Sequence, residues 1–263
     1  MTEEPPPEYP PADGDPILRA ERVTRAFGGV TAVSDVSISV DRGHCVGLIG
    51  PNGAGKSTLL NVLAGAERPD SGAVFLESHD VTRLQAYRRA RLGLIRTFQM
   101  ASEFSGLTVL ENVLVAARAR PMNSLAAAFV PRRYRRVQEE AIERAMSLLE
   151  GVRLHNKADQ LAGKLSGGER RLVEIVRALM SEPKILLLDE PTAGVDPGRI
   201  REVEEYVLTI KASGVTILMV EHQLEVVSRV CDTVYVMASG AIIASGALEE
   251  VRRQRAVVEA YVG

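Results

Sequence analysis

Short, mostly apolar runs recur along the chain, each followed by glycine or a charged residue. Clear examples are Cys45–Ile49, residues 185–188 and residues 215–220. Runs this short suit parallel strands that are buried on both faces. Over residues 137–149 the apolar positions instead recur with helical spacing and face charged positions, as in an amphipathic helix. The alternation of strands and helices predicts an α/β fold with a mainly parallel sheet.

The first apolar run leads into a glycine-rich segment, and a helix-like stretch follows. The segment and the first residue after it are Gly50, Pro51, Asn52, Gly53, Ala54, Gly55, Lys56, Ser57 and Thr58, which contain the complete Walker A pattern. A strand, a glycine turn and a helix start aim backbone N–H groups at one point, where phosphates can bind. Lys56 adds a cation and Ser57 a magnesium ligand. An ordinary strand–turn–helix junction is the alternative, but the flanking pattern favours a nucleoside triphosphate site.

Two carboxylates follow the second apolar run. Asp189 and Glu190 come directly after residues 185–188, at the end of the strand where open α/β sheets bind ligands. Asp189 would hold Mg²⁺, and Glu190 would orient or deprotonate the attacking water. The alternative interpretation is a core strand followed by solvated acidic residues. The presence of the Walker A pattern in the same chain disfavours this alternative.

A second helix start with exposed glycines lies between these motifs. Ser166 is a typical N-cap, and Glu169 three residues later completes a capping box. Gly167 and Gly168 expose further backbone donors in front of the helix, as in an anion site. The chain is therefore predicted to carry two phosphate-binding helix starts.

In this order the motifs resemble those of the ATP-binding cassette family, whose signature is the segment 165–169. The resemblance runs from about Ile17 onward and implies a P-loop NTPase (RecA-like) core with a small antiparallel β layer, including strands near 17–23, 36–40 and 73–76. It also implies an inserted helical subdomain. We expect a single domain over 17–263, with a core at about 17–98 and 160–263, a helical subdomain at about 99–159, and a disordered proline-rich leader over 1–16.

The same resemblance places further residues at the site. It implies that Phe27 stacks on adenine and that Gln99 senses magnesium and water as a catalytic residue. It also implies that Asp196 lies in the loop between two subunits, although the neighbours of Asp196 depart from the family pattern, and that His222 contacts the γ-phosphate. Two such chains would pair head to tail, so that Lys56 of one and the Ser166 segment of the other hold each ATP.

The subfamily is less sharply indicated. The segment 93–99, the apolar insert 122–130 and the ending 257–263 are similar to ATP-binding subunits of branched-chain amino acid importers. The stretch 165–179, together with residues 194–197, also resembles the ATPase of lipopolysaccharide transport, which remains an alternative. The importer resemblance implies transmembrane permease subunits, a second ATPase subunit and an extracytoplasmic substrate-binding protein. It also implies a cytoplasmic location on the inner face of the membrane.

Other classes fit less well. Residues 156–159 spell the guanine-recognition pattern of GTPases, but they follow a helix rather than an apolar strand, so we interpret them as a chance match in a loop. Soluble cassette proteins of translation or chromosome maintenance carry a second cassette or a long coiled coil, neither of which this sequence has. A binding module without hydrolysis is disfavoured because Glu190, Gln99 and His222 are all present.

Composition adds limits. The 263 residues are 46% hydrophobic, enough for one large core, and the net charge of −2 gives no reason to expect nucleic-acid binding. Arginines near 132–136 face acids near 139–143 along a helix, which predicts a solvated face. The two cysteines, Cys45 and Cys231, lie in apolar contexts and suggest buried thiols.

Overall fold

The computed structural model describes residues 16–97, 104–117 and 131–262. The chain divides into two compact units. The first, here called the core unit, contains the described residues up to Arg96, with Lys184–Pro191 and Val207–Gly263. The second, the helical unit, contains the described parts of Thr97–Pro183 with Thr192–Tyr206. The helical unit extends beyond the predicted 99–159 because the helix after Ser166 packs within it.

The core unit is built on a six-stranded sheet with the order β10-β9-β3-β8-β7-β6. Its strands are β3 (Cys45–Ile49), β6 (Leu94–Arg96), β7 (Ile185–Asp189), β8 (Thr216–Val220), β9 (Thr233–Ala238) and β10 (Ala241–Gly246). All neighbours are parallel except β10, which pairs antiparallel with β9 at the edge. Every residue of β3, β7 and β8 is buried, as their uninterrupted apolar runs predict.

A separate antiparallel sheet has the strand order β2-β1-β4-β5. Its strands are β1 (Pro16–Phe27), β2 (Val30–Asp41), β4 (Ser71–Leu76) and β5 (His79–Asp80). The first two are much longer than their sequence patterns predicted, and β1 starts at Pro16, inside the predicted leader. Buried and exposed positions alternate over only part of both strands, and their pairing contains several register shifts. Only part of each strand therefore carries a recognisable pattern.

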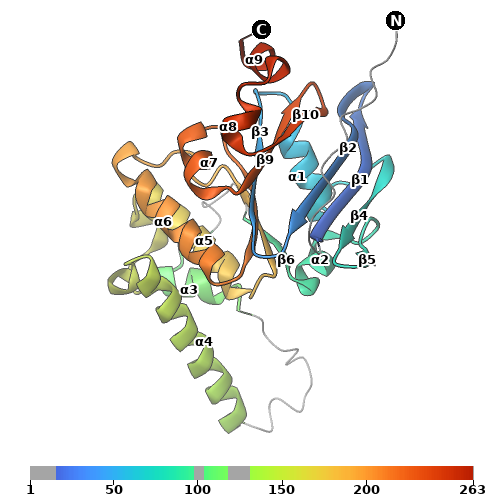
Figure 1. Ribbon diagram of the computed structural model, residues 1–263. Helices are drawn as coiled ribbons and strands as arrows, with labels where there is room; N and C mark the ends of the chain where they lie inside the picture. The colour runs from blue at the N-terminus through green and yellow to red at the C-terminus, as the bar shows by residue number, and fades with distance from the viewer. Residues whose placement is uncertain (1–15, 98–103, 118–130, 263) are drawn as a thin grey trace, which may run out of the picture. The chain divides into compact units, whose positions relative to one another are not determined.

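Helix α1 (Lys56–Ala64) packs against both sheets (Figure 1). Leu60 belongs to the same buried cluster as Val36 of the antiparallel sheet and Leu187 of the parallel one. The C-terminal end of α1 meets a fully buried guanidinium, because Arg89 donates to the carbonyl oxygens of Val62 and Leu63 at 2.8 and 2.7 Å. The other helices wholly within this unit are α2 (Ala86–Leu92), α7 (Leu224–Val230), α8 (Leu248–Val251) and α9 (Arg255–Val262).

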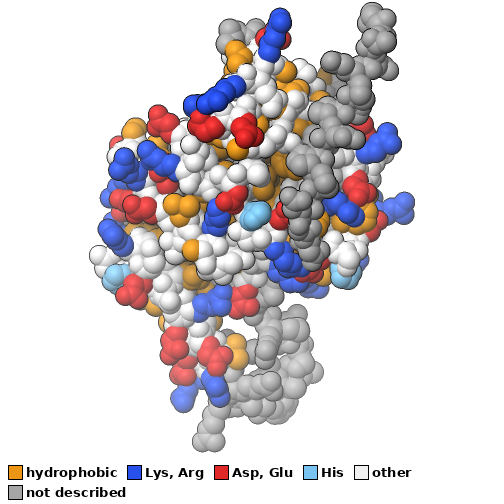
Figure 2. All heavy atoms as spheres, viewed as in Figure 1, with side chains coloured by type: hydrophobic (Ala, Val, Ile, Leu, Met, Phe, Trp, Pro, Cys, Tyr) orange, Lys and Arg blue, Asp and Glu red, His pale blue; other side chains and the backbone are white. Residues whose placement is uncertain are grey.

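The helical unit contains α3 (Val109–Leu114), α4 (Pro131–Gly151) and α5 (Gly167–Met180), which pack on one another (Figure 1). Short 3-10 turns lie at His155–Lys157, Ala162–Lys164 and Pro197–Arg199, and α6 (Ile200–Ala212) begins in this unit. On α4 the ion pairs Arg135–Glu139 and Arg136–Glu140 are exposed, which confirms the predicted solvated face. On the face of the molecule shown in Figure 2, acidic and basic side chains are intermixed.

The two cysteines are free thiols, with Cys45 buried, Cys231 half-buried and 3.8 Å between their sulfur atoms. Across the described ranges, no helix has the length and apolarity required to cross a membrane.

Candidate functional site

Strand register brings the chemical groups of the core unit to one edge of the parallel sheet. Leu48 of β3 pairs with Val220 of β8, and Val220 pairs with Asp189 of β7. The residues that follow each of these positions therefore emerge together at the carboxyl ends of the strands. They are the glycine-rich segment after β3, Glu190 after β7, and the Glu221–His222 pair after β8.

The glycine-rich segment depends on two glycines that no other residue could replace without movement. Gly50 and Gly55 have φ values of +146° and +100°. A Cβ on Gly50 would lie 2.0 Å from the Met237 carbonyl oxygen, and one on Gly55 would lie 2.1 Å from the Ala32 carbonyl oxygen. The loop is thus held tightly against β9 and β2.

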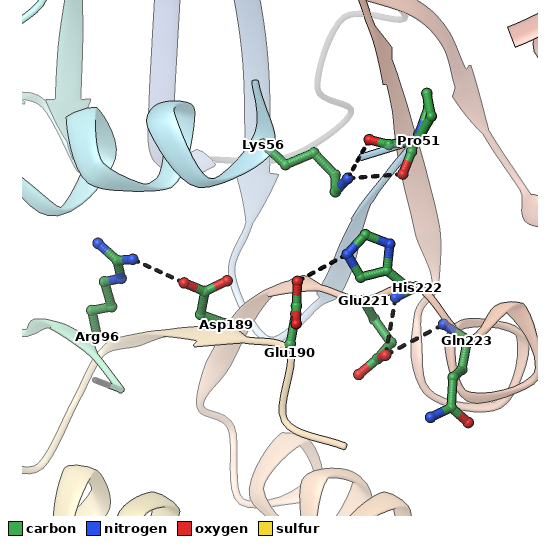
Figure 3. A network of polar contacts seen from close by, with 9 residues as sticks. Pro51, Lys56, Arg96, Asp189, Glu190, Glu221, His222 and Gln223 are labelled. Carbon is green, nitrogen blue, oxygen red and sulfur yellow. Dashed lines mark hydrogen bonds and ion pairs between the residues drawn. The ribbon is translucent and has the colours of Figure 1, made fainter. Parts of the chain in front are cut away.

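Lys56 is the first residue of α1, and its ammonium folds back over the loop (Figure 3). Its Nζ donates to the carbonyl oxygens of Gly50 and Pro51, each at 2.8 Å. Burial lowers the pKa of Lys56, while the nearby carboxylates of Glu190 and Asp189 act in the opposite direction. The cation is therefore already positioned at the loop that is predicted to receive phosphates.

The remaining residues of the segment differ in accessibility. Asn52, Gly53 and Ser57 are exposed, Pro51 and Thr58 are half-buried, and Ala54 is buried. Ser57 is thus an exposed residue at the start of α1, as a magnesium ligand would have to be.

Asp189 is buried and forms an ion pair that the sequence did not predict. Arg96, at the end of β6, places its Nη2 2.9 Å from Asp189 Oδ2 (Figure 3). Its Nη1 donates to Asn61 Oδ1 on α1. One guanidinium thus joins β6, β7 and the helix after the glycine loop. The sequence signal for Arg96 is weak, because it consists only of a charged residue at the end of a short apolar strand.

Glu190 and His222 lie in contact. His222 Nε2 is 2.8 Å from Glu190 Oε1 (Figure 3). Glu190 has a φ of +48°, and its N–H donates to the Val220 carbonyl oxygen at 2.9 Å. A left-handed conformation costs a glutamate of order 1–3 kcal/mol and persists only where the surroundings impose it.

The loop that carries His222 is held by Glu221, a residue that sequence reasoning passed over. The side chain of Glu221 is buried, and its Oε1 accepts from the backbone N–H groups of His222 and Gln223 at 3.0 and 3.3 Å. A carboxylate placed just before a helix start is a usable signal for such a cap.

Phe27 lies at the end of β1, opposite Val30 of β2, and 44% of its surface is exposed. A large aromatic residue with this exposure is not a core residue, the alternative that its type alone favours. An exposed aromatic ring is what a base-stacking residue requires.

The second predicted phosphate site lies at the start of α5 in the helical unit. The capping box is confirmed: Glu169 N–H donates to Ser166 Oγ at 3.3 Å, and Ser166 N–H donates to Glu169 Oε2 at 3.1 Å. Ser166 and Gly167 are exposed, and Gly168 is buried. A Cβ on Gly167 would lie 2.8 Å from the Gly194 carbonyl oxygen, so this position also requires glycine.

Two cations stabilise Glu169. Lys157 and Arg199 place nitrogen atoms 2.8 and 3.2 Å from its Oε1. Burial alone would raise the pKa of Glu169, but the bonds from Lys157, the Ser166 N–H and Arg199 outweigh it and lower the pKa to about 2. Lys157 belongs to the GTPase-like tetrapeptide 156–159, whose first two residues lie in a 3-10 turn and not at the end of a strand, which agrees with its interpretation as a chance match in a loop.

Asp196 and Gln99 are the two remaining predicted site residues. Asp196 accepts a hydrogen bond from the Gly198 N–H at 2.9 Å and so caps the short turn that follows it. Gln99 and the insert 122–130 lie outside the described residues.

Comparison with known proteins assigns the family. The family model described as ABC transporter matches residues 33–193. A probable branched-chain amino acid transport ATP-binding protein of Methanocaldococcus jannaschii is 42% identical over 255 residues, covering 94% of this chain and 97% of the relative. The high-affinity branched-chain amino acid transport ATP-binding protein of Pseudomonas aeruginosa is 38% identical over 250 residues, covering 94% and 98%.

Solved structures agree. A nucleotide-free ATP-binding cassette from an ABC transporter matches with a TM-score of 0.83 and 40% identity, covering 94% of this chain and 99% of that one. An ATP-binding cassette of an ABC transporter in its ADP conformation matches with a TM-score of 0.82, 41% identity and the same coverage. The chain therefore belongs to the ABC transporter family and is an ATPase of the ATP-binding cassette type.

Proposed function

We propose that this chain hydrolyses ATP to power the uptake of branched-chain or related amino acids through a membrane permease. The observation that carries the proposal is the convergence of Lys56, Asp189, Glu190 and His222 at one edge of the parallel sheet. The amino acid assignment is supported by similarity, since relatives named for branched-chain amino acid transport match 94% of the chain.

The phosphates of ATP would bind the segment from Gly50 to Thr58. Its backbone N–H groups and the start of α1 favour an anion, and Lys56 would exchange its carbonyl partners for the β- and γ-phosphates. Ser57 and Asp189 would be the oxygen donors for Mg²⁺. The described residues contain no cluster of three or more side chains from His, Cys, Asp and Glu that could hold a metal. The two oxygen donors Ser57 and Asp189 fit Mg²⁺, which binds one or two protein oxygens together with phosphate oxygens and waters.

Hydrolysis would depend on the Glu190–His222 pair. Glu190 would orient and polarise the attacking water. His222 contacts Glu190 in this structure and would also contact the γ-phosphate of bound ATP. Glu221 would keep His222 in reach by fixing the backbone of the loop. Bound Mg²⁺ would offset the charge on the phosphates.

The site would be completed by a second cassette subunit. Ser166, Gly167 and Gly168 would approach the γ-phosphate held by the partner, with Asp196 in the loop that passes between subunits. The exposure of Ser166 and Gly167 and the capped helix start behind them support this role. Gln99 would join the site to the permease. The complex would sit on the inner face of the membrane and receive its substrate from an extracytoplasmic binding protein.

The test is uptake by the assembled complex. Membrane vesicles that contain the permease should take up labelled leucine, isoleucine or valine in an ATP-dependent way only when this chain is present. Glu190→Gln should abolish uptake while leaving assembly intact. Uptake that is the same without this chain, or co-purification with ribosomes or DNA in place of permease subunits, would overturn the proposal. Preference for other amino acids, urea or amides would overturn the branched-chain assignment alone.

A further inference from the structure

The end of the β1–β2 hairpin carries an arginine stacked on the exposed aromatic ring. The Cζ atom of Arg25 lies 4.5 Å from the centroid of Phe27. We propose that Arg25 is a positioning residue for the nucleotide base, covering one face of Phe27 so that the base stacks on the other. This inference rests on the proposed ATP site and adds to it a residue that none of the predicted motifs contains.

Arg25 is itself held in a fixed orientation. Its Nη2 lies 3.0 Å from Glu67 Oε2, and its Nη1 lies 2.9 Å from Asp70 Oδ1. Asp70 Oδ2 also accepts from the Ala26 N–H at 2.7 Å, and these bonds from Ala26 and Arg25 hold the pKa of Asp70 below its ordinary value. The Arg25 side chain is only 23% exposed. Both of its ion pairs therefore constrain the guanidinium plane against the ring.

The hairpin end lies beside the glycine loop. The Ala32 carbonyl oxygen of β2 approaches Gly55 so closely that a side chain there would clash. Gly240 connects the glycine loop with β2. Its N–H donates to the Ala54 carbonyl oxygen at 3.0 Å, and its carbonyl oxygen accepts from the Ser34 N–H at 2.8 Å. A base stacked on Phe27 would thus lie near phosphates bound at the loop.

The same contacts connect the ring to α1. Glu67 and Asp70 come shortly after Gly65, the C-cap of the helix that starts with Lys56. Arg25 therefore ties the ring on β1 to the chain that emerges from the phosphate-binding helix. Without the Arg25 contacts, the Phe27 ring can adopt other rotamers. The distance between the ring and the glycine-rich segment is then no longer fixed.

Charge also favours this stack. A guanidinium over one ring face is attracted to the ring's negative quadrupole. By withdrawing electron density, it makes the opposite face a better partner for an electron-rich purine. The 44% exposure of Phe27 leaves ring surface available for the base. Removing Arg25 should weaken base-dependent binding by about fivefold to tenfold, as expected for a cation–π contact together with loss of orientation.

Arg19 offers a matched control on the same strand. Its Cζ lies 4.8 Å from the centroid of Phe75, and it pairs with Glu21, so it makes the same kinds of contact as Arg25. Unlike Phe27, neither Phe75 nor Glu21 belongs to the proposed nucleotide site. Arg19→Ala should therefore leave nucleotide binding unchanged.

The experiment compares ATP with inorganic tripolyphosphate, both with Mg²⁺, by calorimetry. Arg25→Ala should lower ATP affinity about fivefold to tenfold and leave tripolyphosphate affinity unchanged. Arg25→Lys, which keeps the charge but not the fork, should recover part of the loss. Phe27→Ala should lose at least as much, and adding Arg25→Ala to it should cause no further loss.

The outcomes separate the two proposals. If the parent binds ATP but Arg25→Ala binds it equally well, the inference is wrong and the proposed function stands. Equal losses for ATP and tripolyphosphate in Arg25→Ala and Arg25→Lys would show a general structural role and would also overturn the inference. A parent protein that binds neither ligand would overturn the proposed function and this inference with it.

Discussion

Glu169→Gln is the substitution whose effect on stability can be worked out most fully. Burial opposes the charge of Glu169, but Lys157, the Ser166 N–H and Arg199 outweigh it and lower its pKa from 4.5 to about 2. At about 1.4 kcal/mol per pKa unit, the shift corresponds to roughly 3 kcal/mol of stability at neutral pH. The side chain is only 10% exposed, so solvent screening is limited.

The sign of the pH dependence follows from the depressed pKa. The stabilisation is present above the ordinary pKa of 4.5 and disappears as pH falls toward about 2. By pH ~3, about 2 of the roughly 3 kcal/mol should be lost. Glu169→Gln cannot titrate, so the difference in unfolding free energy between parent and variant should shrink by that amount on acidification.

The assay is urea unfolding followed by far-UV circular dichroism, because the chain has no tryptophan. Glu111 provides a control, since it forms the same capping box with Thr108 but neither a Lys nor an Arg contributes to its lowered pKa. Glu111→Gln should show a weaker pH dependence. A parent–variant difference for Glu169→Gln that does not change with pH would refute the electrostatic account of the α5 start.

Three other changes have defined outcomes. Lys56→Ala should weaken ATP binding by about 2 kcal/mol or more, because a charge-assisted contact is lost, and unchanged affinity by calorimetry would argue against the phosphate site. Arg89→Met should lower the unfolding free energy by at least about 3 kcal/mol, since the buried carbonyl oxygens of Val62 and Leu63 lose their donor; an unaltered urea midpoint would contradict this. Gln99→Ala should depress transport more than ATP binding, and equal transport by variant and parent would remove its proposed coupling role.

The parallel sheet could be predicted because its strands are buried on both faces. The runs in β3, β7 and β8 are short, apolar and unbroken, so they identify the strands. The glycine or charged residue after each run marks the strand end at which the site lies. The antiparallel sheet was harder to define. Its long strands mix buried and exposed positions with register shifts, so only their regular parts are readable.

The site shows the same division. Lys56, Asp189, Glu190 and Ser166 are marked by fixed motifs, and those motifs specify local backbone shape. Arg96 and Arg25 could not be found in that way, because their partners are distant in sequence and their contacts depend on tertiary packing. The left-handed backbone of Glu190 is likewise imposed by its surroundings rather than by its residue type.

The central claim is a site shared between two subunits, and Glu190→Gln tests it most directly. The substitution keeps the shape of the side chain but removes the group proposed to polarise water, so hydrolysis should fall roughly 10²- to 10⁴-fold while ATP still binds. Unhydrolysed ATP should then hold the two subunits together. Adding Ser166→Arg places bulk where the γ-phosphate must meet the start of α5, and it should prevent pairing without preventing binding at the glycine loop.

The measurement is size-exclusion chromatography with light scattering, with and without ATP, on Glu190→Gln and on the double variant. The samples should include the partner ATPase in a parallel set, since the second subunit can be a different chain. The account predicts an ATP-dependent dimer for Glu190→Gln and a monomer that still binds ATP for the double variant. A Glu190→Gln protein that binds ATP but stays monomeric in both sets would contradict the shared site.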